Sequence, residues 1–236
     1  MCGRFTLASP AETITETFGP FGPADDGSDE VPELAPRYNI APTQSVAVIR
    51  ETARPGGTGR RLEIRRWGLV PHFARRLSGP PLFNARAETL AQKPAFRDAY
   101  RRRRCLIPAD GFFEWRSVSG RRQPFHIRRQ DGAPFGMAGL WETWRPAAGE
   151  GIDSCTIVTT RANALVAPLH DRMPVILPNE AFAPWLDPAP QSPDALAHWL
   201  EPAPDEGWIA YPVDPQVNHA RHDAPSNVEP IFDEAP

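Results

Sequence analysis

Lysine is almost absent from this sequence. Of its 26 basic residues only Lys93 is a lysine, and the rest are arginines. An arginine presents a planar fork of N–H donors that can bind two oxygens of one phosphate, whereas a lysine ammonium is a compact point charge. A basic surface on this protein is therefore built from groups suited to phosphate, although a GC-rich coding sequence also favours arginine.

Cysteines and long apolar runs are scarce as well, and this excludes several classes of protein. The three cysteines are widely spaced with no C-x-x-C pair, which argues against a disulfide framework and a zinc cluster. His219 and His222 have ligand spacing but no clear third ligand, so we predict no metal and no cofactor. No run of 18 apolar residues and no signal-peptide layout exist. We expect a cytoplasmic protein without a membrane partner.

The length and composition indicate one globular unit. The chain has 236 residues and a hydrophobic content of 41%, which is enough for a buried core. We expect a single domain over residues 1–236 and a monomer. Residues 19–36 are acidic and rich in proline and glycine, so they predict a mobile loop, and the C-terminal tail is polar.

The charges are strongly segregated along the chain. Residues 50–129 hold 20 basic residues against 6 acidic ones, whereas residues 130–236 hold 4 against 16. The formal net charge of −3 hides this asymmetry. A clustered positive charge is typical of a surface that binds a polyanion, and it is stronger evidence for such a partner than the choice of arginine alone.

Cys2, directly after the initiator, can acquire a chemistry that no internal cysteine has. Removal of Met1 would leave Cys2 with a free α-amine and a thiol on adjacent carbons, with reference pKa values of about 7.7–8 and about 8.5. Such a 1,2-aminothiol condenses with an aldehyde to an imine, which the thiol closes to a thiazolidine ring. The position of Cys2 alone also allows the alternative that it is an incidental cysteine at a frayed terminus.

The rest of the chain alternates short strands and helices. Ser9-Pro10-Ala11-Glu12 reads as a capping box that opens a helix. The pattern also predicts a hairpin over residues 45–69, and a helical stretch from about residue 84 to 104 that ends in four arginines, which a solvated helix end would also explain. Further strands are predicted at 105–115, with a break at Asp110-Gly111, and at 124–128, 134–141, 154–160 and 208–213, and helices at 179–186 and 192–200.

Two residues outside the N-terminus are candidates for acid–base chemistry. Glu114 stands between Phe113 and Trp115, where desolvation would raise its pKa toward neutrality. An ordinary outward-facing strand carboxylate is the alternative. His170 precedes an apolar strand and is expected on a loop at its mouth, although a loop histidine is often merely exposed.

Six ordered blocks, spread over nearly the whole chain, resemble the SOS response-associated peptidase (SRAP) family. They are residues 1–5, 37–42, 67–68, 84–89, 108–115 and 170–174. Members of this family shield abasic sites in single-stranded DNA by a covalent DNA–protein crosslink. The resemblance implies an α+β fold with a strongly bent, barrel-like antiparallel sheet and flanking helices. It also implies abasic single-stranded DNA as the partner and association with the nucleoid when bound to it.

The resemblance also assigns roles by position. It implies that Cys2 is the crosslinking nucleophile, that Asn84 orients it, and that Glu114 and His170 form an acid–base pair. The DNA-binding set it implies comprises Arg4, Arg86, Trp67, Phe73 and Thr159. Where some relatives have two tryptophans after the glycine of the third block, this chain has His72-Phe73, so its wedge against bases would be shaped differently. The family's peptidase label leaves a proteolytic or lyase-type activity open.

Two other classes of function remain open at this stage. A mature N-terminal Cys followed by Gly also begins N-terminal-nucleophile amidohydrolases, which cleave an amide through a thioester and need no basic groove. A non-covalent single-stranded DNA-binding module, with Cys2 incidental, would also use the clustered arginines. The charge segregation argues against the amidohydrolase. Only the detection of a covalent adduct distinguishes the function implied by the SRAP resemblance from a non-covalent DNA-binding module.

Overall fold

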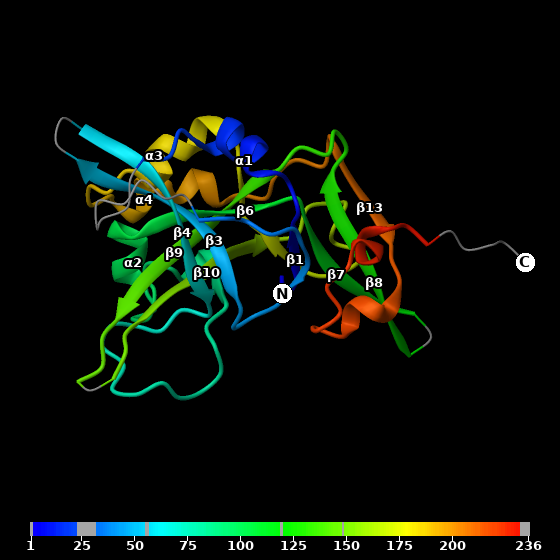
Figure 1. Cartoon of the computed structure of the whole chain (residues 1–236), viewed down its shortest axis with the longest axis horizontal. Helices are drawn as coiled ribbons and strands as arrows, with labels where there is room; N and C mark the ends of the chain where they lie inside the picture. Colours follow the sequence, from blue (N-terminus) through cyan, green and yellow to red (C-terminus); the bar gives the residue numbers. More distant parts are fainter. Residues whose placement is uncertain (1, 23–31, 55–56, 119, 148, 232–236) are drawn as a thin grey trace, which may run out of the picture.

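A computed structural model of the chain describes residues 2–22, 32–54, 57–118, 120–147 and 149–231. It consists of two β-sheets with short helices around them (Figure 1). Part of the predicted mobile loop, residues 23–31, lies outside the described residues. In the parts that are described, Phe21 bridges to Arg60 and Leu34 packs against the core, so the segment is partly docked on the domain.

The larger sheet closes into a barrel. Its ring comprises β3 (Ser45–Arg54), β4 (Gly57–Trp67), β10 (Ile152–Arg161), β9 (Phe135–Trp144) and β6 (Arg104–Ala109). The ring is complete because β9 pairs with β10 as well as with β6, and β6 pairs with β3. The predicted barrel-like sheet is thus confirmed, although it is mixed: β4 and β10 run parallel.

The smaller sheet carries the N-terminus. Its strands lie in the order β13 (Trp208–Pro212), β8 (Arg121–Arg129), β7 (Gly111–Val118), β1 (Phe5–Leu7) and β2 (Arg37–Ile40). The chain passes from the barrel into this sheet at the predicted Asp110-Gly111 break, between β6 and β7. A Cβ at Gly111 would lie 2.2 Å from His126 Nε2, so only glycine permits this close passage.

Short strands and helices complete the structure. Three strands extend the barrel sheet, namely β5 (Asn84–Arg86), β11 (Arg172–Pro174) and β12 (Ile176–Leu177). The helices are α1 (Ala11–Phe18), α2 (Arg97–Arg102), α3 (Phe182–Leu186) and α4 (Pro193–Ala197), with 3-10 turns η1 (Ala87–Thr89), η2 (Asn179–Ala181), η3 (His198–Leu200), η4 (Pro215–Asn218) and η5 (Pro225–Val228). Helices α1 and α3 lie together over one side of the barrel, where Phe18 stacks on Phe182 (Figure 1). No helix among the described residues is long and apolar enough to cross a membrane.

The main core fills the barrel and the space under the helices. Inward-facing aliphatic side chains of β3, β6, β9 and β10 are fully buried, including Val48, Leu106, Leu140 and Ile157. Each such side chain contributes about 1.5–3 kcal/mol on burial. Cys105 and Cys155 are buried, free thiols within this core, which fits a packing role.

Three local predictions were wrong for identifiable reasons. Helix α1 forms as predicted, but Ser9 does not cap it, because its hydroxyl donates to Asp110 Oδ1 instead. Residues 84–86 form strand β5 rather than a helix start, since they pair with β10. Arg104 is not a solvated helix end: it is buried and donates to backbone oxygens of Tyr100 and Trp185.

Candidate active site

Cys2 lies at the N-terminal edge of the smaller sheet and is fully buried. Strand β1 pairs with β7, so that Phe5 lies opposite Phe112, and the Phe113 amide donates to Arg4 O across 3.0 Å. This pairing brings the start of the chain beside the strand that carries Glu114. The pairing of β1 with β7 thus fixes the neighbourhood of Cys2, whose thiol also contacts Arg4 O at 4.0 Å.

Asn84 reaches Cys2 from the barrel. The parallel pairing of β5 with β10 puts Asn84 opposite Ile157 and directs its amide toward the N-terminus. Asn84 Nδ2 donates to the Cys2 carbonyl oxygen across 2.8 Å. Its Oδ1 is buried and has no hydrogen-bond partner among the residues that the structure describes. One side of this amide therefore holds the cysteine backbone, and the other offers an acceptor inside the site.

Glu114 is a buried carboxyl group next to Cys2. It is 2% exposed, and burial raises its pKa from 4.5 to about 7. Burial also raises the pKa of the Cys2 thiol well above its usual range, and the negative charge of Glu114 raises it further. At neutral pH the carboxyl group is therefore poised between its two forms, while the thiol keeps its proton.

His170 lies on the loop before β11, as predicted. Its Nδ1 accepts a hydrogen bond from the Arg172 amide at 2.9 Å and lies 2.8 Å from Asp171 Oδ1. The first contact suits the neutral ring, with hydrogen on Nε2, and the second suits the protonated ring. Burial lowers the pKa of His170, so the neutral form dominates at pH 7.

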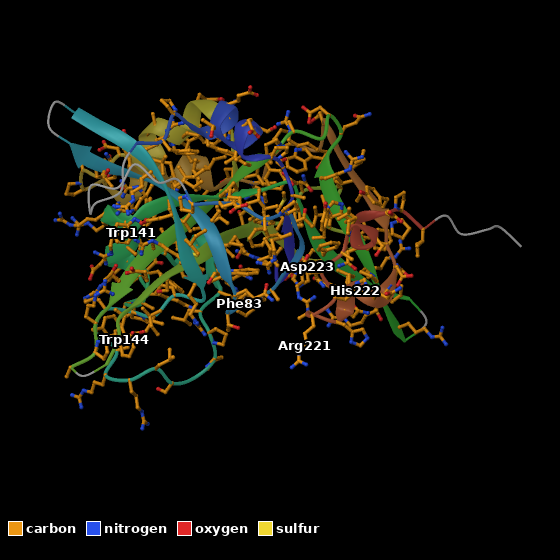
Figure 2. All side chains as sticks on the ribbon, in the orientation of Figure 1. Phe83, Trp141, Trp144, Arg221, His222 and Asp223 are labelled. Atoms are coloured by element: carbon orange, nitrogen blue, oxygen red, sulfur yellow. The ribbon has the colours of Figure 1, made fainter. Side chains whose placement is uncertain are left out.

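A pocket of about 540 Å³ joins these elements. It is lined by Gly3, Arg4, Pro42, Phe83, Glu114, Trp115, Arg122, His170 and Asn218. Figure 2 shows Phe83 near the middle of the molecule, with Arg221, His222 and Asp223 of the C-terminal segment to its right. Three predicted site residues thus share one pocket, and a fourth, Cys2, adjoins Gly3 at its wall.

The arginines implied in DNA binding differ in how far the protein uses them. Arg4 lines the pocket but is engaged, because Nη1 donates to Asn39 Oδ1 and to Val217 O and Nη2 donates to Asn218 O. Arg86 is exposed at the end of β5 and does not line the pocket. Arg4 thus ties the C-terminal segment to the site, and Arg86 is a surface cation.

Trp67 and Thr159 are corrections to the predicted DNA-binding set. Both are fully buried. The Trp67 indole donates to Phe83 O across 2.8 Å and packs edge-on against Phe5 and Phe83. It has no surface on which a base could stack, so its role is to support Phe83 at the pocket wall. Thr159 lies inside the barrel wall, and its hydroxyl does not line the pocket.

Phe73 is displayed on the surface, as a wedge residue would be. Its side chain is 55% exposed on the loop after β4. That loop is anchored to β9, because His72 Nδ1 lies 3.0 Å from Glu142 Oε2 and the Trp144 indole donates to Ala74 O across 2.7 Å.

Sequence reasoning did not predict the residues that anchor this loop, nor the pocket residues Phe83, Arg122 and Asn218. It pointed only to Trp115, because this residue is the neighbour of Glu114.

His219 and His222, whose spacing alone resembled that of metal ligands, make other contacts. Among the described parts of the chain there is no group of three or more His, Cys, Asp or Glu side chains that could hold a metal ion. His222 Nδ1 contacts Asn227 Oδ1 at 2.9 Å, and the His219 and His222 carbonyls accept from Asn39. These histidines therefore hold the C-terminal segment against β2.

A buried cysteine, an amide that binds its backbone, and a carboxyl group and an imidazole around one pocket define a cysteine-centred site where the barrel meets the smaller sheet. The sequence model described as SOS response associated peptidase (SRAP) matches residues 1–220, and the chain belongs to that family. The sequence is 39% identical to the abasic site processing protein YoqW of Bacillus subtilis, over 97% of this chain and 99% of the relative.

Further relatives and solved structures agree with this assignment. The abasic site processing protein YedK of Escherichia coli is 33% identical, over 79% of each chain. A crystal structure from Bordetella bronchiseptica has 33% identity and a TM-score of 0.74, covering 90% of this chain and 100% of that one. A protein from Bacteroides thetaiotaomicron superposes with a TM-score of 0.79 over 98% of this chain at 24% identity, which bears on the fold alone.

Proposed function

We propose that this protein recognises abasic sites in single-stranded DNA and traps them covalently through Cys2. The observation that carries the proposal is the convergence of three distant segments on one residue: Cys2 adjoins a pocket that contains Glu114 and His170, and Asn84 holds its backbone. The names of the similar proteins, which process abasic sites, support the same substrate.

The reaction follows from the chemistry of the aminothiol. An abasic deoxyribose is mostly a closed hemiacetal, and His170 assists opening of the ring to the C1′ aldehyde. The α-amine of Cys2, freed when Met1 is removed, attacks the aldehyde carbon, and loss of water gives an imine. The thiol then adds to the imine carbon and its proton moves to the nitrogen, which closes the thiazolidine.

The pKa values favour this order of steps. The Cys2 thiol keeps its proton at neutral pH because burial raises its pKa, so the amine reacts first. Glu114, with a pKa of about 7, can give a proton to the departing water and take one from the thiol. A protonated thiol is a poor nucleophile toward a peptide carbonyl, and we do not propose general proteolysis.

Intact mass spectrometry, with and without abasic single-stranded DNA, tests the proposal. We expect the purified protein to lack Met1 and to gain the mass of the strand minus one water. Cys2→Ala should lose the heat-stable adduct, although its new α-amine can still form a slow, reversible imine. An equally heat-stable adduct with Cys2→Ala would rule out the aminothiol mechanism.

The same samples separate the two alternatives. Ammonia release from glutamine without any DNA adduct would favour an amidohydrolase. Binding of the strand that disappears on a denaturing gel would favour a non-covalent module. Single-turnover rates against pH then test the acid–base pair, because Glu114→Gln and His170→Ala should each slow crosslinking about 10²–10⁴-fold while strand binding persists. Wild-type rates in both variants would remove both residues from the mechanism.

A further inference from the structure

Arg122 lines the candidate pocket, and none of the roles assigned above uses it. It lies on β8 with an exposed side chain. Its guanidinium carbon lies 5.7 Å from the centre of the Trp115 ring, and the Trp115 indole in turn donates to Asn218 Oδ1 across 2.6 Å. The aromatic ring therefore supports the guanidinium while leaving its N–H edges available.

The donors of the pocket cations are unequally available. Arg4 directs three hydrogen bonds to the protein, through Nη1 to Asn39 and Val217 and through Nη2 to Asn218. Among the residues that the structure describes, the Arg122 guanidinium lies over the Trp115 ring and makes no hydrogen bond or salt bridge, and its charge lowers the pKa of both Glu114 and His170. An arginine carries five N–H donors in a fixed fork, so Arg122 has the larger unused capacity for an anionic ligand.

The charges of the pocket also favour a cation at this position. Glu114 brings a partly ionised carboxylate at neutral pH, and His170 is mostly neutral because burial lowers its pKa. A DNA strand carries one negative charge per phosphate and must approach this carboxylate. Among the described side chains that line the pocket, Arg122 is the arginine whose guanidinium is not hydrogen-bonded to the protein, and its charge already acts on Glu114 and His170.

We infer that Arg122, supported by Trp115, binds a backbone phosphate next to the reacting sugar and so positions the lesion over Cys2. This inference rests on the proposed function and adds to it a phosphate site inside the pocket, separate from the exposed Arg86 on β5. The ligand is a phosphodiester of the lesion strand, because the free N–H edges of Arg122 and the bidentate geometry of phosphate oxygens match.

Equilibrium binding to a strand that cannot react provides the test. The probe is a single-stranded oligonucleotide with one tetrahydrofuran abasic analogue, which has no aldehyde and forms no thiazolidine. We expect Arg122→Ala to bind it about tenfold more weakly, with a salt slope shallower by about 0.7, the value for one phosphate contact on a single strand. Arg122→Lys should keep most of the salt slope but recover only part of the affinity, since a lysine cannot bind bidentately.

Arg121 provides the matched control. It is the adjacent residue on β8, it is also exposed, and it does not line the pocket. Arg121→Ala should bind the same probe as wild type does. Because both side chains are exposed, neither variant is expected to lose thermal stability, which is checked by the unfolding temperature.

A neutral methylphosphonate, placed either 5′ or 3′ of the analogue, locates the contact. At one of these positions the methylphosphonate should weaken wild type about tenfold and Arg122→Ala hardly at all, so the two changes are not additive. Affinity of Arg122→Ala within twofold of wild type, or full additivity at both positions, would overturn the inference. Crosslinking of a true abasic strand by wild type is measured separately, so failure of the proposed function and failure of the phosphate site give different results.

Discussion

The side-chain amide of Asn84 donates to the main-chain oxygen of Cys2 across 2.8 Å, although 82 residues separate them in the sequence. This contact joins the barrel to the smaller sheet at Cys2. The cysteine carbonyl is held without any charge being added beside Glu114. An amide suits this position better than a carboxylate or an ammonium would. Because it is neutral, it shifts neither the pKa of the Cys2 thiol nor that of the Glu114 carboxyl group any further.

Removing that amide should slow crosslinking without weakening DNA binding. One net hydrogen bond is worth about 0.5–1.5 kcal/mol, so Asn84→Ala should reduce the single-turnover rate up to about tenfold. Asn84→Asp should be slower still, because it replaces the donor with a carboxylate that faces the Cys2 carbonyl. Affinity for the tetrahydrofuran strand is the control, and a loss there equal to the loss in rate would assign Asn84 to binding.

Glu114→Gln should stabilise the protein at high pH. The pKa of Glu114 is raised by burial to about 7, so the group favours folding only while it is neutral, below about pH 4.5, and this stability is lost as the pH rises through about 7. The variant cannot ionise and should exceed wild type by about 3 kcal/mol at pH 8, and by nothing at pH 4. Urea unfolding at both pH values measures this.

Glu88→Gln is a control in which the change in stability relative to wild type at high pH has the opposite sign. Its hydrogen bond with Arg172 lowers the pKa of Glu88, so the ionised group contributes stability above its ordinary pKa. This variant should be slightly less stable than wild type at pH 8, and the difference should shrink as the pH falls through the lowered pKa of Glu88. If Glu114→Gln behaved in the same way, the carboxylate of Glu114 would be stabilised rather than destabilised by its surroundings.

Arg86→Ala should weaken binding to normal and abasic strands alike. Arg86 is exposed at the end of β5, and a phosphate contact carries no information about sequence or lesion. The dependence of affinity on salt should also become shallower. Arg102→Ala, which removes an exposed arginine at the end of α2, is the comparison variant. An unchanged affinity and salt slope in Arg86→Ala would place the DNA path elsewhere.

Asp110→Ala should destabilise the fold more than Ser9→Ala. Asp110 accepts hydrogen bonds from the Ala8 and Ser9 amides and from the Ser9 hydroxyl, directly after β1. Charge-assisted bonds are worth about 1.5–3 kcal/mol each, so Asp110→Ala, which loses three of them, should cost at least about 4.5 kcal/mol, and Ser9→Ala, which loses one, about 1.5–3 kcal/mol. Denaturant midpoints compare the two. Equal losses would mean that the hydroxyl, not the amides, dominates.

The local patterns in the sequence were sufficient for most strands. Alternating side chains and turn residues predicted the hairpin of β3 and β4 and the break between β6 and β7. Closure of the barrel depends on the pairing of β9 with β10 and of β3 with β6, for which no local pattern exists. The barrel was therefore expected from the family resemblance and not from periodicity.

The mistakes arose where long-range contacts override local preference. Ser9 is a good capping residue, but a carboxylate 101 positions away offers its hydroxyl a stronger, charged acceptor. Residues 84–86 have no strand pattern of their own and take their conformation from β10. Trp67 was expected to face DNA, but the sequence does not tell on which side of β4 the barrel closes.

The assembly of the site from Cys2, Asn84, Glu114 and His170 also sets the order in which the protein matures during synthesis. At about 5–20 residues per second, roughly 10–30 s separate the synthesis of Cys2 from that of His170. Throughout that interval Cys2 has neither the burial that raises its thiol pKa nor the pocket around it. An unfinished chain that has lost Met1 is thus a bare aminothiol, open to any small aldehyde in the cell, and completion of the fold is what restricts its reactivity.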